Sequence, residues 1–247
     1  MREIFVVFEP EWLTADFLAD KTAVVMDVLR ATSSMLAALA NGATRVVPTM
    51  EVSEARELKA TLPAGTVVLG GERGGLQIDG FDVGNTPQEF APAVVGGKTV
   101  VMTTTNGTRA ILMSLGAPQV YVAAINNVGA TARALAERCR GDVVLVASGT
   151  ERRISWEDSF CAGAIVERLA AEQRGGPWQL TDSAMIAQEI WQVAKRDIPA
   201  ALRRGRGGRN VMKFNFDAAF AVCGALDCYD FAARVHHDPL EIVVEKS

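Results

Sequence analysis

The sequence predicts an α/β protein built as three layers, α/β/α, around a mainly parallel or mixed sheet. Short β-branched runs alternate with alanine-rich segments of helical periodicity, which is the pattern of βαβ units. Polar, glycine-containing segments also follow several of the predicted strands, where ligands bind in such folds. The chain has 247 residues, 49% of them hydrophobic, which is enough for a sizeable core. We expect residues 1–247 to form a single α/β domain, built as one unit or as two packed α/β halves.

The strands are predicted from short apolar runs rich in Val, Ile and Thr. In chain order they are Ile4–Phe8, Thr22–Met26, Arg45–Pro48, Thr66–Leu69, Thr99–Thr103, Gln119–Ala123, Val143–Ala147 and Leu240–Val244. Each is four to five residues long, as expected for strands of a compact domain.

The helices are predicted from the longer periodic segments between these runs. In order they are Ser33–Ala40, Val52–Leu62, Thr108–Leu115, Val128–Arg138, Trp156–Ala171, Asp182–Arg196 and Phe216–Cys228. Gly, Arg and Pro interrupt the pattern at Gln173–Pro177 and Arg203–Arg209, which we expect to be flexible.

Composition excludes several classes of protein. A net charge of -4 and a pI near 5.4 argue against bulk binding to nucleic acid or to a membrane surface. The four cysteines form no CxxC pair, and Met1 begins neither a signal peptide nor a membrane-spanning stretch, so a cytoplasmic protein with reduced thiols is expected. The only histidines are His236 and His237, which excludes a histidine-rich zinc or di-iron centre.

The segment from Gly70 to Pro87 is the most informative part of the chain. It reads GGERGGLQIDGFDVGNTP and contains six glycines. Each glycine costs ordering entropy on folding, so an ordinary turn is the weaker explanation for this loop. It follows a predicted buried strand, and we therefore expect Glu72 and Arg73 at the carboxyl end of that strand, where open α/β sheets bind ligands.

Two further strand ends carry similar chemistry. A carboxylate or an amide is accompanied by an arginine at each of the three ends: Asp27 with Arg30, Glu72 with Arg73, and Asn106 with Arg109. Small or hydroxyl residues lie where helices are expected to begin: Thr32, Ser33, Gly107 and Thr108. Free N–H groups at helix starts bind oxyanions, and arginine adds paired donors. The sequence therefore predicts a site for a small anion.

The carboxylates near these ends predict a divalent cation. Asp27, Glu72, Glu157 and Asp158 are hard oxygen ligands, and Mg²⁺ bridges such groups to phosphate. Each also has a structural explanation: Asp27 and Arg30 can form an ion pair at a helix start, and acidic residues such as Glu157 and Asp158 favour a helix N-terminus.

Taken together, the motifs resemble those of the 2-phosphosulfolactate phosphatase family. They are DVLRATSS from Asp27, GERGG with IDGFDVGNTP from Gly71 to Pro87, TTTNGTRA from Thr103 and WEDSFCAG from Trp156. The resemblance covers most of the chain. It implies a three-layer α/β/α phosphatase that uses Mg²⁺ to convert 2-phosphosulfolactate to 3-sulfolactate and phosphate, the second step of the phosphoenolpyruvate and sulfite route to coenzyme M.

The resemblance also suggests roles for residues of this chain. The catalytic candidates are Asp27, Glu72 and Asp158, and the metal candidates are Asp27, Glu72, Glu157 and Asp158. The candidates for substrate binding are Arg30, Thr32, Ser33, Arg73, Gly74, Gly75, Asn85, Asn106, Gly107, Thr108 and Arg109. Asp27 either attacks phosphorus or binds Mg²⁺ while water attacks. A homodimer is expected only by analogy with the family.

Other functions remain as alternatives. One is a phosphatase for a different small phosphorylated acid. Another is an enzyme that binds such an acid without hydrolysing it, for example an isomerase or a transferase. The third is a protein that binds anions without catalysis. The basic run Arg203–Arg209 is either a lid over the substrate or an exposed loop, and it lacks the repetition and aromatic residues of an RNA-binding segment. Thr86 stands where a serine is expected before Pro87, and it keeps the hydroxyl.

Overall fold

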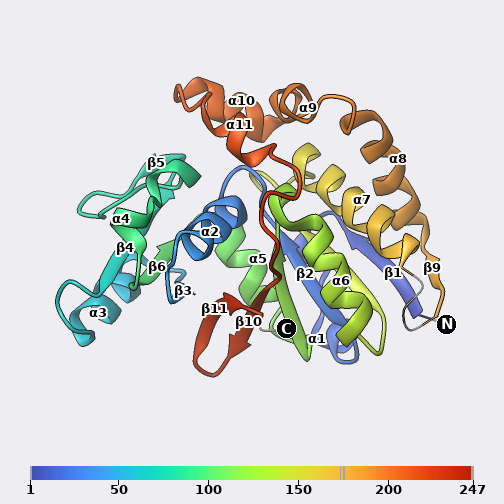
Figure 1. Ribbon diagram of the computed structural model, residues 1–247, viewed down its shortest axis with the longest axis horizontal. Helices are drawn as coiled ribbons and strands as arrows, with labels where there is room; N and C mark the ends of the chain where they lie inside the picture. The colour runs from blue at the N-terminus through green and yellow to red at the C-terminus, as the bar shows by residue number, and fades with distance from the viewer. Residues whose placement is uncertain (1, 173, 175, 246–247) are drawn as a thin grey trace.

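One continuous sheet runs through the molecule. The computed structural model describes residues 2–172, 174 and 176–245 (Figure 1), and within them eleven strands pair in the order β5-β4-β6-β3-β11-β10-β7-β2-β8-β1-β9. Their bounds are β1 Arg2–Val7, β2 Thr22–Met26, β3 Arg45–Pro48, β4 Val67–Arg73, β5 Leu76–Gln77, β6 Thr99–Thr103, β7 Gln119–Ala123, β8 Val143–Ala147, β9 Trp178–Leu180, β10 Ala233–His237 and β11 Leu240–Val244.

Helices connect most of the strands. The α-helices are α1 Ala15–Leu18, α2 Ala31–Ala40, α3 Val52–Thr61, α4 Pro92–Val95, α5 Gly107–Met113, α6 Val128–Arg138, α7 Trp156–Ala171, α8 Asp182–Ala194, α9 Ile198–Arg204, α10 Arg206–Lys213 and α11 Ala219–Cys223. Short 3₁₀ turns occur at Pro10–Trp12, Pro87–Glu89 and Ile125–Asn127.

The sheet is mixed but mainly parallel, as the sequence predicts. Strands β4, β6 and β3 form one parallel group, and β7, β2, β8, β1 and β9 form a second. The antiparallel hairpin of β10 and β11 lies between the two groups and pairs with β7 on one side and β3 on the other. Figure 1 shows the smaller group with α3 at one end of the molecule and α8 with β9 at the other.

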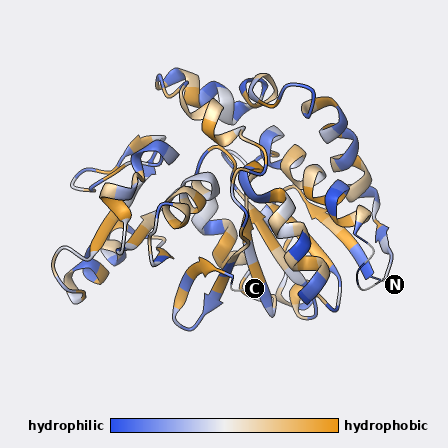
Figure 2. Ribbon diagram, viewed as in Figure 1, coloured by the Kyte–Doolittle hydropathy of each residue, from blue (hydrophilic) through white to orange (hydrophobic). Residues whose placement is uncertain are grey.

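Strand β2 shows how the three layers arise. All five of its residues are buried, and successive side chains point to opposite faces of the sheet. Val24 and Met26 pack into a core cluster with residues of α6, α7 and α8, whereas Ala23 and Val25 pack into a second cluster with residues of α2 and α5. The strands are accordingly hydrophobic along most of their length (Figure 2), and helices cover both faces. The predicted α/β/α architecture is confirmed.

Helix α2 lies deep in the molecule. Every residue from Ala31 to Leu39 is buried, so the start of this helix is not a surface feature. Its first turn follows directly from β2 through the segment that begins at Asp27. The chain after β2 therefore carries its polar residues into the interior, next to the ends of other strands.

Several predicted bounds were wrong. The strand predicted at Thr66–Leu69 continues to Arg73, and the helix predicted at Phe216–Cys228 is limited to Ala219–Cys223. Strands β5, β9 and β10 were not predicted. The region Gln173–Pro177 includes Gln173 and Gly175, which lie outside the described residues.

The run Arg203–Arg209 is helical, so the predicted flexible loop was wrong. It contains the end of α9 and the start of α10, with Gly205 between them. A Cβ atom on Gly207 would collide with the carboxylate of Glu157, and one on Gly208 would collide with the carbonyl of Leu202. These glycines permit close packing, a role that composition alone does not distinguish from flexibility.

No helix in residues 2–172, 174 and 176–245 is long and apolar enough to cross a membrane.

Gly71 tests the contact between β4 and β6. It has φ 150°, and a Cβ atom there would collide with the carbonyl oxygen of Thr103 on β6. We expect Gly71→Ala to lower the free energy of unfolding by more than about 2 kcal/mol, because it combines backbone strain with this collision. Gly65→Ala is the control, since Gly65 also has a positive φ but open space around it, and a loss of about 1 kcal/mol is expected. Equal losses in urea denaturation would contradict this account of Gly71.

Candidate active site

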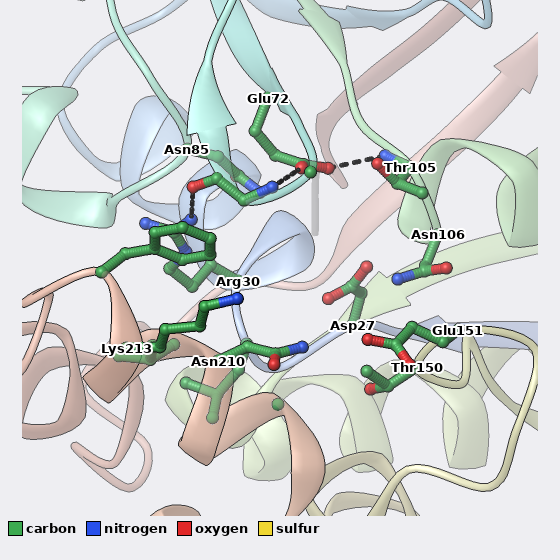
Figure 3. Close-up of a pocket in the computed structure, with 16 residues that line it drawn as sticks. Asp27, Arg30, Glu72, Asn85, Thr105, Asn106, Thr150, Glu151, Asn210 and Lys213 are labelled. Atoms are coloured by element: carbon green, nitrogen blue, oxygen red, sulfur yellow. Dashed lines mark hydrogen bonds between the residues drawn. The ribbon is translucent and has the colours of Figure 1, made fainter.

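A pocket lies where strands β2, β4, β6 and β8 end (Figure 3). We call it the Asp27 pocket, and its lining residues are Asp27, Leu29, Arg30, Glu72, Gly74, Gly75, Asn85, Thr105, Asn106, Thr150, Glu151, Gly207, Asn210, Val211, Lys213 and Phe214. Four separate loops and helix α10 thus meet around one space. The predicted convergence of strand ends on polar chemistry is seen here.

Asp27 occupies a central position in this pocket. It directly follows β2 and is 7% exposed. The amide of Ala31 donates to Asp27 Oδ1 at 3.3 Å, and the amide of Asp27 donates to Thr32 Oγ1 at 3.0 Å, which fixes the start of α2. Burial, reinforced by the negative charge of Asp158, raises the pKa of Asp27 to about 8. The side chain points into the pocket between Asn106 and Asn210 (Figure 3).

Asp158 lies behind the pocket and supports the loop that carries Asp27. Its two carboxylate oxygens accept hydrogen bonds from the amide of Val28 at 2.9 Å and from the hydroxyl of Ser148 at 3.0 Å. It is 2% exposed, and burial together with the charge of Glu157 raises its pKa to about 7. Asp158 therefore connects α7, β8 and the segment after β2 without lining the pocket.

Glu157 is buried beneath the start of α10. Its Oε2 atom has no hydrogen-bond partner, and Gly205 and Gly207 pack directly against the carboxylate. Burial raises the pKa of Glu157 to about 7. Three carboxyl groups with raised pKa values, those of Asp27, Glu157 and Asp158, thus lie close enough to influence one another.

Glu72 lines the pocket and holds two of its loops together. Its Oε2 accepts from the amide of Gly75 at 2.7 Å and its Oε1 from the amide of Thr105 at 2.8 Å. Gly74 and Gly75 have positive φ values of 62° and 87°, which close the turn after β4. A carboxylate that is satisfied by two backbone donors fixes the relative position of the β4 and β6 ends.

Arg30 supplies the buried positive charge of the pocket. It is 6% exposed and donates to Thr86 Oγ1 at 2.7 Å and to the carbonyl of Gly75 at 2.9 Å. The ring of Phe216 lies 4.4 Å below the guanidinium carbon. Thr86 stands where a serine is expected, and its hydroxyl, which a serine would also provide, accepts this hydrogen bond from Arg30. Asn85, next to it, has a buried Oδ1 with no hydrogen-bond partner.

Four predicted substrate-binding residues are buried behind the pocket rather than lining it. The hydroxyl of Ser33 donates to the carbonyl of Val28 at 2.9 Å, and Thr32 is engaged by Asp27 as described above. Thr108, in the first turn of α5, exchanges hydrogen bonds with Thr104 in the segment before the helix. Gly107 packs against Asp27 and Ala31, where a Cβ atom would lie 2.7 Å from the Ala31 side chain. All four shape the loops around Asp27.

Arg73 and Arg109 face a neighbouring pocket. This second pocket is lined by Met50, Glu51, Arg73, Thr104, Thr105, Asn106, Arg109, Glu151 and Arg152. Arg73 donates to backbone carbonyls of Glu72 and Met50, and Arg109 forms an ion pair with Glu11. Thr105, Asn106 and Glu151 line both pockets, so the two adjoin.

Sequence reasoning missed the contribution of α10 to the Asp27 pocket. Gly207, Asn210, Val211 and Lys213 of this helix, with Phe214 after it, form one wall, and Thr150 and Glu151 after β8 form another. Lys213 is exposed and directs its amine into the pocket (Figure 3). The sequence Gly207–Asn210 could have indicated this wall, but the run was predicted to be a flexible loop, whereas it is part of helix α10.

The carboxylate of Asp27 is the pocket's candidate ligand for a hard cation. Among the described residues, no group of three or more His, Cys, Asp or Glu side chains is arranged to hold a metal ion. Mg²⁺ does not require such a group, because proteins commonly bind it through one or two carboxylates with water and substrate phosphate. Asp27, a buried carboxylate open to a pocket, fits that mode of binding.

The fold and the pocket define an α/β enzyme with a charged site at its strand ends. The chain belongs to the 2-phosphosulpholactate phosphatase family, whose family model matches residues 7–238. This family is one of phosphoric monoester hydrolases.

Individual relatives agree with this assignment. A probable 2-phosphosulfolactate phosphatase of Symbiobacterium thermophilum is 39% identical over 212 residues, which cover 86% of this chain and 90% of the relative. A protein of the same name from Clostridium acetobutylicum is 38% identical, covering 90% of this chain and 92% of the relative. One from Gloeobacter violaceus is 39% identical, covering 83% and 84%.

The carboxyl cluster predicts how stability depends on pH. The folded protein keeps the protons of Asp27 and Asp158 up to about pH 8 and about pH 7, whereas the unfolded chain loses them near pH 4. Unfolding therefore releases protons from about pH 5 to about pH 8, and this contribution to the free energy of unfolding falls as the pH rises. Without metal, Asp158→Asn should flatten that fall, because the amide oxygen can still accept from Val28 while the amide nitrogen can donate to the hydroxyl of Ser148. Identical pH slopes in urea denaturation of the two proteins would contradict the raised pKa values.

Proposed function

We propose that this enzyme hydrolyses 2-phosphosulfolactate to 3-sulfolactate and phosphate in the Asp27 pocket, with Mg²⁺ as its metal ion. Membership of the family supports the reaction. The observation that carries the choice of site is the carboxylate of Asp27, which is buried at the end of β2 and opens into a pocket beside a buried arginine. The four free cysteines support a reducing compartment, and we infer a cytoplasmic enzyme.

Arg30 binds the phosphate in this proposal. A guanidinium has five N–H donors, and Arg30 uses two terminal nitrogens to hold Thr86 and Gly75. Remaining donors are available to phosphate oxygens, and the two protein contacts hold the group still before substrate arrives. Because the charge is already desolvated and positioned, its attraction to a developing negative charge costs little rearrangement.

Lys213 binds the second acidic group of the substrate. The substrate carries a sulfonate and a carboxylate in addition to its phosphate. Arg30 alone does not balance these negative charges. Lys213 forms no ion pair with any described residue, and its amine points into the pocket on the side of Asp27 (Figure 3). The ammonium of Lys213 is carried on a flexible side chain, so it can follow the position of the sulfonate or carboxylate in the pocket.

Asp27 would hold Mg²⁺ in this proposal, because it is the buried carboxylate that opens into the pocket. When bound, Mg²⁺ neutralises charge on the transferring phosphoryl group. Binding a cation requires the ionised form of Asp27, whose pKa of about 8 in the metal-free protein makes affinity for the ion rise with pH. Asp158 contributes by holding the amide of Val28, and so keeps Asp27 directed into the pocket.

Phosphate release tests the reaction and the metal together. We expect the purified protein to release phosphate from 2-phosphosulfolactate with Mg²⁺ and to stop when a chelator is added in excess. Phospholactate and simple phosphate esters should react more slowly, because they lack the sulfonate. Release from those esters alone would exclude the sulfolactate assignment, and release from none of the compounds would exclude a phosphatase.

Asp27→Asn tests the central carboxylate. We expect turnover to fall by about 10²-fold or more, since the variant loses the charge that this carboxylate supplies, whether to phosphorus or to the ion. Asp82→Asn is the control, because Asp82 lies within the glycine-rich segment Gly70–Pro87 but pairs with Lys59 and does not line the pocket. Trapping with hydroxylamine then distinguishes the two roles, since only attack by Asp27 forms an acyl phosphate. Unchanged turnover in Asp27→Asn would refute the proposed site.

Lys213→Met tests the choice of substrate. The variant keeps an unbranched side chain of similar length but loses the charge, so we expect KM for 2-phosphosulfolactate to rise by about tenfold. KM for a simple phosphate ester should change little, because that substrate has no second acidic group. A matching rise for both substrates would assign Lys213 to the phosphate instead.

A further inference from the structure

A positively charged pocket, distinct from the Asp27 pocket, uses other residues of α10. We call it the Arg204 pocket, and it is lined by four arginines, Arg153, Arg204, Arg206 and Arg209, together with Ile154, Trp156 and Gly205. No carboxylate lines it. Its residues come from three places in the chain: the turn before α7 with the first residue of that helix, the end of α9, and the start of α10.

Most of the positive charge in this pocket is not neutralised. Arg206 forms an ion pair with Glu151, but none of the described carboxylates forms one with Arg153, Arg204 or Arg209. Nearby surface arginines do find partners, as Arg203 does with Asp217 at 2.6 Å. Glu157 lies beneath Gly205 and interacts electrostatically with Arg209, but it is 1% exposed, forms no ion pair with Arg209 and does not line the pocket. Crowded cations of this kind attract a multivalent anion.

Contacts within the protein hold the arginines in place. The guanidinium carbon of Arg204 lies 4.9 Å from the centre of the Trp156 ring, and Trp156 Nε1 donates to the carbonyl of Ala201 at 3.0 Å. Arg209 donates to the carbonyl of Arg204 at 2.7 Å. Because these contacts connect α7, α9 and α10, two of the cations are oriented before any ligand arrives. Such preorganisation reduces the entropy that binding would otherwise cost.

We propose that the Arg204 pocket binds a small anion with several adjacent phosphates, such as a free polyphosphate or the phosphate chain of a nucleoside triphosphate. Arginine presents paired donors that match phosphate oxygens, and the four residues surround one space from three elements. This site is separate from the one where hydrolysis takes place, and the inference does not depend on the proposed function. Helix α10 forms a wall of both pockets, so a test has to separate them.

Isothermal titration calorimetry with inorganic triphosphate, without metal, tests this site. We expect binding to the wild type and a loss of affinity of at least about tenfold in the double variant Arg204→Gln, Arg209→Gln, because two charge-assisted contacts are removed. Arg203→Gln is the matched control, since Arg203 is adjacent in sequence but outside the pocket. Lys213→Met reports on the Asp27 pocket, and both of these variants should bind like the wild type.

Several outcomes would overturn the proposal. Full affinity in the double variant would refute the Arg204 pocket as the site, and a loss in Lys213→Met alone would place the triphosphate in the Asp27 pocket. A loss in Arg203→Gln as large as in the double variant would reduce the effect to general surface charge. Tighter binding of a short single-stranded RNA than of triphosphate, dependent on Arg203, would indicate a nucleic-acid surface.

Two additional arms complete the test. Titration with ATP distinguishes the sources: equal affinity for ATP and triphosphate supports recognition of the phosphate chain, and tighter binding of ATP supports a nucleoside triphosphate. Thermal unfolding checks that the double variant is folded. If it is not, Arg153→Gln, in the exposed turn before α7, replaces it, and undiminished binding in that variant would refute the site.

Discussion

The crowding of buried carboxylates around Asp27 is the constraint on which the rest of the site depends. Removing a carboxylate from water favours its protonated form, and Asp158 adds repulsion to that effect. Folding tolerates the cluster because the groups can keep their protons in the metal-free protein. In the proposed function, the positive charge of a bound cation offsets the repulsion between these carboxylates.

The other acidic residues support this arrangement from different positions. The carboxylate oxygens of Glu72 accept hydrogen bonds from the amides of Gly75 and Thr105. Those of Asp158 accept from the amide of Val28 and the hydroxyl of Ser148. Each of these carboxylates joins two segments that are distant in sequence. The mutual geometry of the strand ends therefore comes from side chain to backbone hydrogen bonds as well as from the sheet. Arg30 extends the same network to the loop that contains Thr86.

The sequence predicted the architecture well because its evidence is local. Alternating patterns located most of the strands and helices, and polar residues after β2, β4 and β6 indicated where a site would form. The burial of Thr32 and Ser33, and the turn of Arg73 and Arg109 toward a neighbouring pocket, could not be predicted from these patterns. The burial of the hydroxyl residues and the orientation of the two arginines depend on which face of each loop packs against the other strands. That packing is a feature of the tertiary structure. The glycines of Arg203–Arg209 were misread for a similar reason, because only the packing of this run against Glu157 and Leu202 shows what they do.

A crystal structure of the protein with Mg²⁺ and orthovanadate would test the central claim most directly, since vanadate imitates a phosphoryl group during transfer. The account predicts vanadate in the Asp27 pocket, in contact with Arg30 and with the ion bound at Asp27. Vanadate in the neighbouring pocket, held by Arg73 and Arg109 with Asp27 free of metal, would contradict it and move the chemistry to the other side of Asn106.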